Sequence, residues 1–230
     1  MKKYKLGILS AVIALAVLIG VQTTALATPI SIYLDDGSTF ITIADNAAGD
    51  ADSRAGIINY AGGFSTNWLV NVTVAMTYPI VGSQTNPVLD LTSVNVTSTG
   101  GGVQNLTVAA SAAGYSPQIQ GAVFNAGGTT SGTVLFGAWA DSSNALFGQQ
   151  VLIGVLGPFN AGAFSGTVSG PTSATLPYSL TTAAFISHTG AGSTTFDAEV
   201  IVPEPATLIL LGSGLAGLGL FGRRKLRGKK

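Results

Sequence analysis

The sequence predicts an all-β fold with a helix at each end of the chain. The expected architecture is an antiparallel β-sandwich, and a jelly roll is one arrangement that would fit. Three observations predict it. Apolar and polar residues alternate with a period of two over many short segments, turn residues separate those segments, and residues 28–202 show no sustained 3.6-residue period. The helices are expected only at the ends, as an N-terminal signal peptide helix and a C-terminal transmembrane helix.

The clearest strand covers residues 68–78. One of its faces carries only large apolar or aromatic side chains: Trp68, Val70, Val72, Val74, Met76 and Tyr78. Its other face begins with Leu69, Asn71 and Thr73, so we expect the first face to be buried. Core packing is therefore the expected role of Trp68.

Similar runs predict eleven more strands, at 30–34, 40–43, 56–60, 88–96, 103–109, 118–124, 132–140, 151–156, 161–168, 178–188 and 194–202. In the strand at 88–96 the alternation changes phase between Leu91 and Val94, which predicts a β-bulge. Turn residues separate the runs at Asp36-Gly37, Gly62-Gly63, Asn86-Pro87, Gly100-Gly101-Gly102, Gly127-Gly128 and Gly170-Pro171. The run at 132–140 is apolar around Trp139, which is expected to pack in the core as well.

The N-terminus has the three regions of a secretory signal. Lys2, Lys3 and Lys5 precede an apolar stretch at 6–21, and small residues at Ala25 and Ala27 follow it. This order predicts cleavage after Ala27, so that the mature chain begins at Thr28. A retained membrane anchor is the alternative, and the small-x-small site argues against it.

The C-terminus is also segmented. Val202, Pro203, Glu204 and Pro205 come first, an apolar run reaches Phe221, and a basic cluster begins with Arg223, Arg224 and Lys225. Residues 206–222 would span about 26 Å as a helix, at the short end of a bilayer crossing. The basic residues 223–230 would stay cytoplasmic by the positive-inside rule. We therefore expect a signal peptide at 1–27, an exterior domain at 28–202 and a tail at 203–230.

These tail residues resemble the PEP-CTERM sorting signal of Gram-negative bacteria: Pro203-Glu204-Pro205, a glycine-containing apolar helix and a terminal Arg/Lys cluster. The resemblance implies an exosortase substrate, processed by an integral-membrane protease of the exosortase type after signal peptidase has acted. It implies an inner-membrane precursor, held transiently through the C-terminal helix, and delivery to the outer surface or the extracellular matrix. The body is similar to uncharacterised exterior domains that precede such tails.

Charge excludes some partners. Residues 28–202 contain nine acidic residues and one basic residue, Arg54, which gives a net charge of −8. Nucleic acid is disfavoured as a partner because phosphate contacts need lysine and arginine. The chain has no cysteine, so disulfides, thiol catalysis and cysteine-based metal sites are excluded.

Three groups of residues are candidate sites. His188 is the only histidine and no nucleophile elbow accompanies it, so we expect a surface or strand-end side chain rather than a catalytic one. Asp197 and Glu199 share a strand face and could form a glycosidase pair, although a solvated edge is the expected role. Asp45, Asp50 and Asp52 could bind calcium as a cofactor; the alternative is a plain solvated loop.

The leading functional hypothesis is non-enzymatic: a surface or matrix component associated with exopolysaccharide, as in a biofilm. The first alternative is a carbohydrate-binding module that uses Trp68, Trp139 or tyrosines as stacking platforms, which an exposed row of aromatic side chains would support. The second alternative is a secreted hydrolase, which a pair of carboxylates in a cleft would support.

Overall fold

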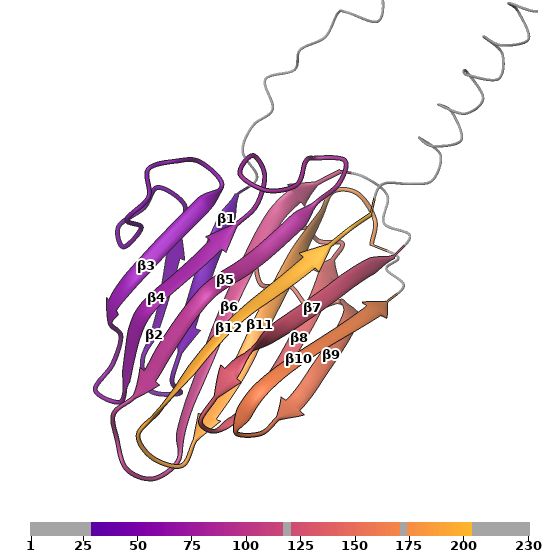
Figure 1. Cartoon of the computed structure of the whole chain (residues 1–230). Coiled ribbons are helices and arrows are strands. Elements are labelled where there is room, and N and C mark those ends of the chain that lie inside the picture. The colour runs from indigo at the N-terminus through magenta and orange to yellow at the C-terminus, as the bar shows by residue number, and fades with distance from the viewer. Residues whose placement is uncertain (1–28, 117–120, 171–173, 204–230) are drawn as a thin grey trace, which may run out of the picture.

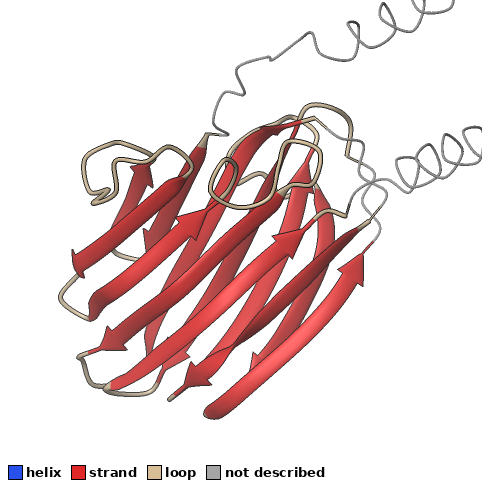
Figure 2. Cartoon of the chain, turned by 45° about the horizontal axis from the view of Figure 1, so that its top comes forward, coloured by secondary structure: helices blue, strands red, loops and turns tan. Residues whose placement is uncertain are grey.

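The computed structural model describes residues 29–116, 121–170 and 174–203, which form two antiparallel sheets packed face to face (Figure 1). The predicted all-β sandwich is confirmed, and Figure 2 shows strands and loops throughout the described part. The twelve strands are β1 (Ile30–Asp35), β2 (Phe40–Ala44), β3 (Ile57–Gly63), β4 (Trp68–Met76), β5 (Val88–Ser98), β6 (Gln104–Tyr115), β7 (Ala122–Thr130), β8 (Thr133–Asp141), β9 (Val151–Phe159), β10 (Gly162–Gly170), β11 (Tyr178–His188) and β12 (Gly192–Ile201). Each one overlaps a strand predicted from the alternation.

The strands are divided equally between the two sheets. Sheet A has the order β2-β1-β6-β11-β8-β9, and sheet B has the order β10-β7-β12-β5-β4-β3. Most neighbours in a sheet are therefore distant in sequence. The tight connection between β9 and β10 carries the chain from one sheet to the other, so these two edge strands lie at the same end of the sandwich (Figure 1).

The core lies between the sheets and is built from the inward side chains of both. The largest fully buried side chains are those of Trp68, Tyr115, Tyr178, Phe124, Phe136, Ile30, Ile32, Leu34, Ile58, Leu89, Leu91 and Leu106. Burial of such side chains is the main source of stability for a domain without disulfides, at about 1.5–3 kcal/mol for each. Because the strands are fixed from the inside, their outward side chains are held on a rigid support.

The bulge predicted in β5 is confirmed. Along the pairing with β12, Val94 faces Phe196 and Leu91 faces Ala198, so two residues of β5 oppose one residue of β12. Ser93 lies in this bulge and has a positive φ of 53°.

The alternation predicted for β4 is only half right. Trp68 and Val70 are buried as expected, but further along the strand it is Thr73 and Ala75 that are buried, while Val74 is half-buried. Two register shifts against β5, between Val70 and Val72 and between Val72 and Val74, reverse the phase of the strand. A period-two pattern cannot report such shifts, because they depend on the partner strand.

Two of the glycine pairs expected at turns lie inside strands instead. Gly62-Gly63 ends β3, and Gly127-Gly128 lies in the middle of β7. A Cβ atom on Gly128 would come within 2.0 Å of the carbonyl oxygen of Thr195 on β12, so close strand approach explains this glycine.

The predicted signal peptide, the span at 206–222 and the basic end lie outside the described residues, and the domain boundaries at 27 and 203 stay predictions. Among the residues that the structure does describe, no helix has the length and apolarity to cross a membrane. One residue before the end of the described range, Val202 is buried, and its N–H donates to the carbonyl oxygen of Pro87 at 2.9 Å.

Candidate functional site: a polar groove on sheet B

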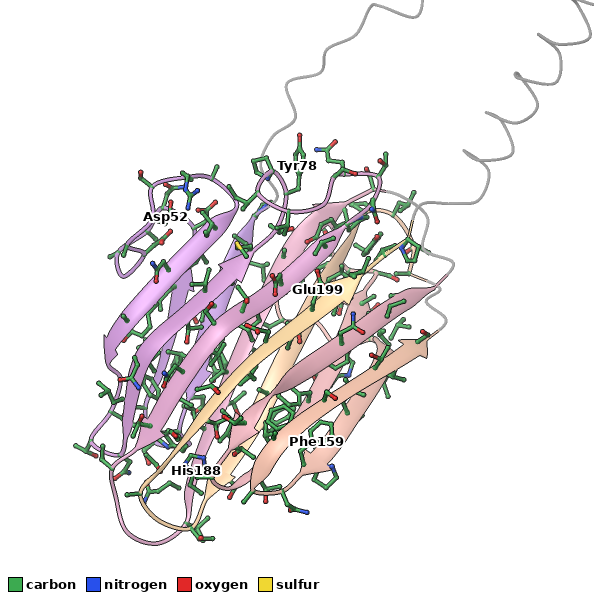
Figure 3. All side chains as sticks on the ribbon, in the orientation of Figure 1. Asp52, Tyr78, Phe159, His188 and Glu199 are labelled. Carbon is green, nitrogen blue, oxygen red and sulfur yellow. The ribbon has the colours of Figure 1, made fainter. Side chains whose placement is uncertain are left out.

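The outer face of sheet B carries a shallow groove over β5, β12 and β7. Two adjoining hollows of about 380 and 310 Å³ share Gly127 and Asp197. The lining side chains are mainly carboxylates, amides and hydroxyls: Asp90, Thr92, Asn95, Asn125, Thr195, Asp197 and Glu199. Glu199 lies on this face toward the C-terminal end of β12 (Figure 3).

The groove is hollow because its floor lacks side chains. Gly127 stands beside Asp197 on β12 and beside Ser165 on β10. A Cβ atom on Gly127 would meet only ordinary contacts, 3.6 Å from the carbonyl oxygen of Phe164 and 3.8 Å from Cβ of Ser165. Packing therefore does not require a glycine at position 127. Because Gly127 has no side chain, the hollow above it stays open.

Three acidic side chains meet at one end of the groove. Glu199 pairs directly with Asp90 on β5 and, on its other side, with Asn125 on β7. Burial, with Glu199 and Asp197 nearby, raises the pKa of Asp90 to about 6. Burial also raises the pKa of Glu199, against the effect of a hydrogen bond from Asn125. The groove can thus donate and accept hydrogen bonds, and part of its charge titrates near neutral pH.

Asp197 has a structural role at the other end of this cluster. One of its oxygens, Oδ1, accepts hydrogen bonds from Oγ1 of Thr92 and from the N–H of Ser93, both at 2.6 Å. These bonds hold the bulge in β5 and fix the carboxylate in the groove.

The predicted pair Asp197 and Glu199 thus lies on the outer face of β12 as expected. Their closest partners, Asp90 and Asn125, could not be found from the sequence. These residues are 109 and 74 positions before Glu199 in the chain, and only the pairing of β5 and β7 with β12 makes them its neighbours. The alternation of β5 and β7 does place both side chains on an outer face, which was the available signal.

His188 ends β11, as expected, but the prediction of a surface position is wrong. The ring is buried between the sheets, 5.1 Å from the ring of Trp68. Its Nδ1 is 2.7 Å from Oγ of Ser98 and its Nε2 is 2.8 Å from Oγ1 of Thr194. Burial lowers the pKa of His188. No carboxylate contacts the imidazole in the described part of the chain, so the arrangement is a buried hydrogen-bond network.

The aspartate-rich loop lies at the opposite end of the sandwich from His188 (Figure 3). Its carboxylates accept bonds from within the loop and from β3: Asp45 from the N–H of Gly56 at 2.8 Å, and Asp50 from the N–H of Asn59 at 3.0 Å. Asp52 forms an exposed ion pair with Arg54 at 2.7 Å, and the hydrogen bond from Arg54 lowers the pKa of Asp52 to about 2.

Calcium at this loop stays a prediction. The described residues contain no group of three or more His, Cys, Asp or Glu side chains arranged to hold a metal ion. Binding by Asp45, Asp50 and Asp52 would require these carboxylates to exchange their present hydrogen bonds for the ion.

The two tryptophans are placed differently. Trp68 is buried, as expected, so it offers no stacking surface. The expectation of core packing is wrong for Trp139, which is half-buried on the outer face of sheet A, because the inner face of β8 is taken by other residues. A Cβ atom on Gly137 would come within 2.2 Å of the Trp139 ring, so the indole lies against its own strand.

The aromatic side chains do not form a continuous exposed row on sheet A. Phe40 on β2 and Phe185 on β11 are 70% and 40% exposed. Between them in the same cross-strand row lie Asp35 and Thr107. With strands about 4.8 Å apart, the two phenylalanines are separated by about 14 Å. Hydrogen bonding in the groove of sheet B is therefore better supported than stacking on sheet A.

The described domain is an antiparallel β-sandwich with a polar groove on the outer face of sheet B. The model of the PEP-CTERM protein-sorting motif matches residues 202–225, which confirms the resemblance of the tail to the signal of exosortase substrates. The motif implies export, a membrane-anchored precursor and processing by exosortase, a membrane protease. Val202 and Pro203 are its described residues, and Glu204 onward lies outside them.

No curated protein sequence matches the chain. Among solved structures, a carbohydrate-binding module, TmCBM61, in complex with beta-1,4-galactotriose is similar at a TM-score of 0.31 and 10% identity, over 60% of this chain and 90% of that one. The C-terminal CBM6 of LamC, a laminarinase from Zobellia galactanivorans, gives 0.28 and 11% over 62% and 98%, and the mannan-recognising module TmCBM27 gives 0.28 and 13% over 59% and 88%. Similarity at this level does not define a ligand for this chain.

Proposed function

We propose that this chain is a non-catalytic component of the bacterial outer surface or extracellular matrix, and that its exterior domain holds exopolysaccharide in the groove of sheet B. The sorting motif at residues 202–225 supports the destination. The observation that carries the binding proposal is the groove itself, a hollow lined by carboxylates, amides and hydroxyls on a rigid sheet.

The chemistry of the lining suits sugar hydroxyls. Carboxylates and amide oxygens accept hydrogen bonds from hydroxyl groups, and the amide nitrogen of Asn125 and the hydroxyl of Thr195 can donate in return. The groove is open along the sheet, so a chain could lie across it without threading its ends. The excess of acidic groups favours a neutral or cationic glycan over an anionic one.

Filling the groove tests the proposal. Gly127→Val adds a side chain to the floor at a position where a Cβ atom meets only ordinary contacts. We expect retention of the host's exopolysaccharide by the protein to fall about tenfold or more, with an unchanged melting temperature. Gly63→Val is the matched control, because a Cβ atom on this strand glycine has no neighbour within 4 Å. Equal retention by both variants would show that the groove does not hold the polysaccharide.

A secreted glycoside hydrolase is the second candidate, since Asp90 and Glu199 are a direct cross-strand pair in a hollow. Directly opposed residues have Cβ atoms about 4.5–5.5 Å apart, and the carboxyl groups of retaining glycosidases are about 5–5.5 Å apart. A carboxyl whose pKa is raised to about 6 could serve as a general acid. New reducing ends in the polysaccharide, lost in Glu199→Gln, would favour this candidate over the non-catalytic one.

Sorting is tested separately through the tail. The two prolines fix φ near −65° and lack N–H donors, so Pro203-Glu204-Pro205 should present a stiff, extended segment to the protease. We expect Glu204→Ala to leave export intact while blocking removal of the basic end, so that the protein stays in the inner membrane. Normal trimming and surface delivery of this variant would leave the tail as a simple anchor.

A further inference from the structure

The two sheets have four edge strands among the described residues: β2 and β9 in sheet A, and β3 and β10 in sheet B. An edge strand exposes unpaired N–H and C=O groups that can pair with another chain. Natural proteins block such edges with short strands, prolines, charged residues, bulges or covering loops. Three of these four edges carry such a device.

The edge at β3 is covered by the aspartate-rich loop. The N–H of Asn59 donates to Oδ1 of Asp50 at 3.0 Å, and the carbonyl oxygen of Asn59 accepts from the N–H of Ala51 at 2.8 Å. The edge at β2 is only five residues long. The edge at β9 contains Pro158 and has two register shifts against β8.

Strand β10 has none of these devices. Its nine residues pair with β7 in an unbroken register from Gly162 to Gly170. It contains no proline and no charged residue. Within the described part of the chain, no strand or loop pairs with its other side.

The hydrophobic core is also incompletely covered at this end. Phe164 and Val168 point to the inner face of β10 and pack on the core, yet both remain partly exposed. Phe164 stacks on Phe159 of β9 with ring centroids 4.9 Å apart. A further strand beside β10 would bury these side chains.

Charge permits a second copy to approach here. The domain has a net charge of −8, but residues 122–140 and 151–170, which form β7, β9, β10 and most of β8, contain no charged residue. All nine acidic residues lie elsewhere. Two copies that meet at β10 keep their acidic regions apart, which limits the repulsion that other contacts would produce.

We propose that β10 pairs antiparallel with β10 of a second copy of this chain, about a two-fold axis at Gly166. In this register Phe164 lies opposite Val168 on the inner face, twice by symmetry, and Ser165 lies opposite Thr167 on the outer face. Aromatic and β-branched pairs and hydroxyl pairs are favourable cross-strand neighbours. The strand is thus complementary to itself, as a two-fold interface requires.

This inference goes beyond the proposed function and does not depend on it. Pairing at β10 joins two copies of sheet B edge to edge into one continuous sheet. The groove over β5, β12 and β7 remains open on the outer face of each copy. A matrix component would then present two polysaccharide grooves on one surface, which increases its avidity for a long polymer.

Cross-linking tests the register, because the chain has no native cysteine. The full-length double variant Ser165→Cys, Thr167→Cys should form a covalent dimer on oxidation, since each new thiol would face its partner across the axis. Ser165→Cys alone should not, because diagonal neighbours are about 7–8 Å apart, beyond disulfide reach. Absence of the dimer in the double variant overturns the proposed register.

Edge blocking tests the partner. Ser165 is exposed, so Ser165→Lys should leave the fold and melting temperature intact while it weakens dimerisation of the full-length chain about tenfold or more in sedimentation experiments. The matched control is Thr42→Lys on the edge strand β2, which should sediment as the unchanged dimer. A monomeric native chain, a complex at β10 with a different protein only, or equal effects of both lysines would overturn the proposal.

Discussion

Ser98 of sheet B and His188 of sheet A are joined by a 2.7 Å hydrogen bond inside the sandwich. Ser98 also donates its hydroxyl proton to the carbonyl oxygen of Gly190 at 2.7 Å, so it accepts the proton of His188 Nδ1. Nε2 then accepts from Thr194, whose oxygen in turn is bonded to Thr130. With a neutral imidazole every donor in this chain of bonds has an acceptor, whereas a second proton on the ring would require the Thr194 hydroxyl to turn away from Nε2.

The first prediction is that His188 makes folding sensitive to acid. Burial lowers the pKa of His188 in the folded state, so the unfolded chain, with an ordinary value of 6.5, binds its proton first. This contribution to stability is complete above pH about 6.5 and is lost as the pH falls through the lowered folded pKa. Urea unfolding across this range should show a decline that is absent in His188→Gln.

The same variant should lose about 1–3 kcal/mol near neutral pH, since Ser98 and Thr194 lose buried partners. Thr97→Ala, on the same strand as Ser98 but on the outer face, is a suitable comparison. An unchanged pH dependence in His188→Gln would mean that other groups cause the decline.

The second prediction is that Asp90 has the opposite pH dependence. Its folded pKa of about 6 lies above the ordinary value of 3.8, so the protonated form is favoured by folding. The associated stability is fully present below pH about 4 and is lost as the pH rises through about 6. Asp90→Asn keeps an uncharged group of the same size and should be more stable than the native chain near neutral pH, by about 1 kcal/mol after allowance for solvent screening.

Near pH 4 the difference between Asp90→Asn and the native chain should disappear, because both side chains are then uncharged. Thermal unfolding at several pH values measures it. A variant that is less stable than the native chain at neutral pH would show that the charged carboxylate is stabilised by the groove.

The third prediction is that only one glycine of the pair in β7, Gly128, is required by the close approach of β12. Gly128→Ala should destabilise the domain by about 2–4 kcal/mol, because its Cβ atom would lie 2.0 Å from the carbonyl oxygen of Thr195 and the strands would have to move. Gly127→Ala, one position earlier, meets only ordinary contacts and should change the free energy of unfolding little. Equal losses in chemical denaturation would contradict this account.

The fourth prediction concerns the aspartate-rich loop. Asp50→Ala removes the acceptor for the N–H groups of Asn46, Asp52 and Asn59 and uncovers the edge of β3, so we expect a loss of about 1–3 kcal/mol in the presence of a chelator. If the loop binds calcium, millimolar calcium will raise the melting temperature of the native chain and not that of this variant. An unchanged native melting temperature contradicts the calcium site.

The sequence by itself determined what depends on neighbours along the chain. Alternation located all twelve strands and the phase change at Leu91 and Val94 located the bulge, because side chains of one strand alternate whatever the strand pairs with. The motif that begins at Val202 and continues through Pro203-Glu204-Pro205 was likewise readable, since a sorting signal is a linear segment.

Only the tertiary structure decided which strands meet and in what register. It placed Asp90 and Asn125 on either side of Glu199, buried His188 against Ser98, reversed the phase of β4 and left β10 as an unprotected edge. These relationships join residues that are far apart in the chain. Their register depends on how both sheets fill one core together, and a pattern within a single strand carries no information about its partner.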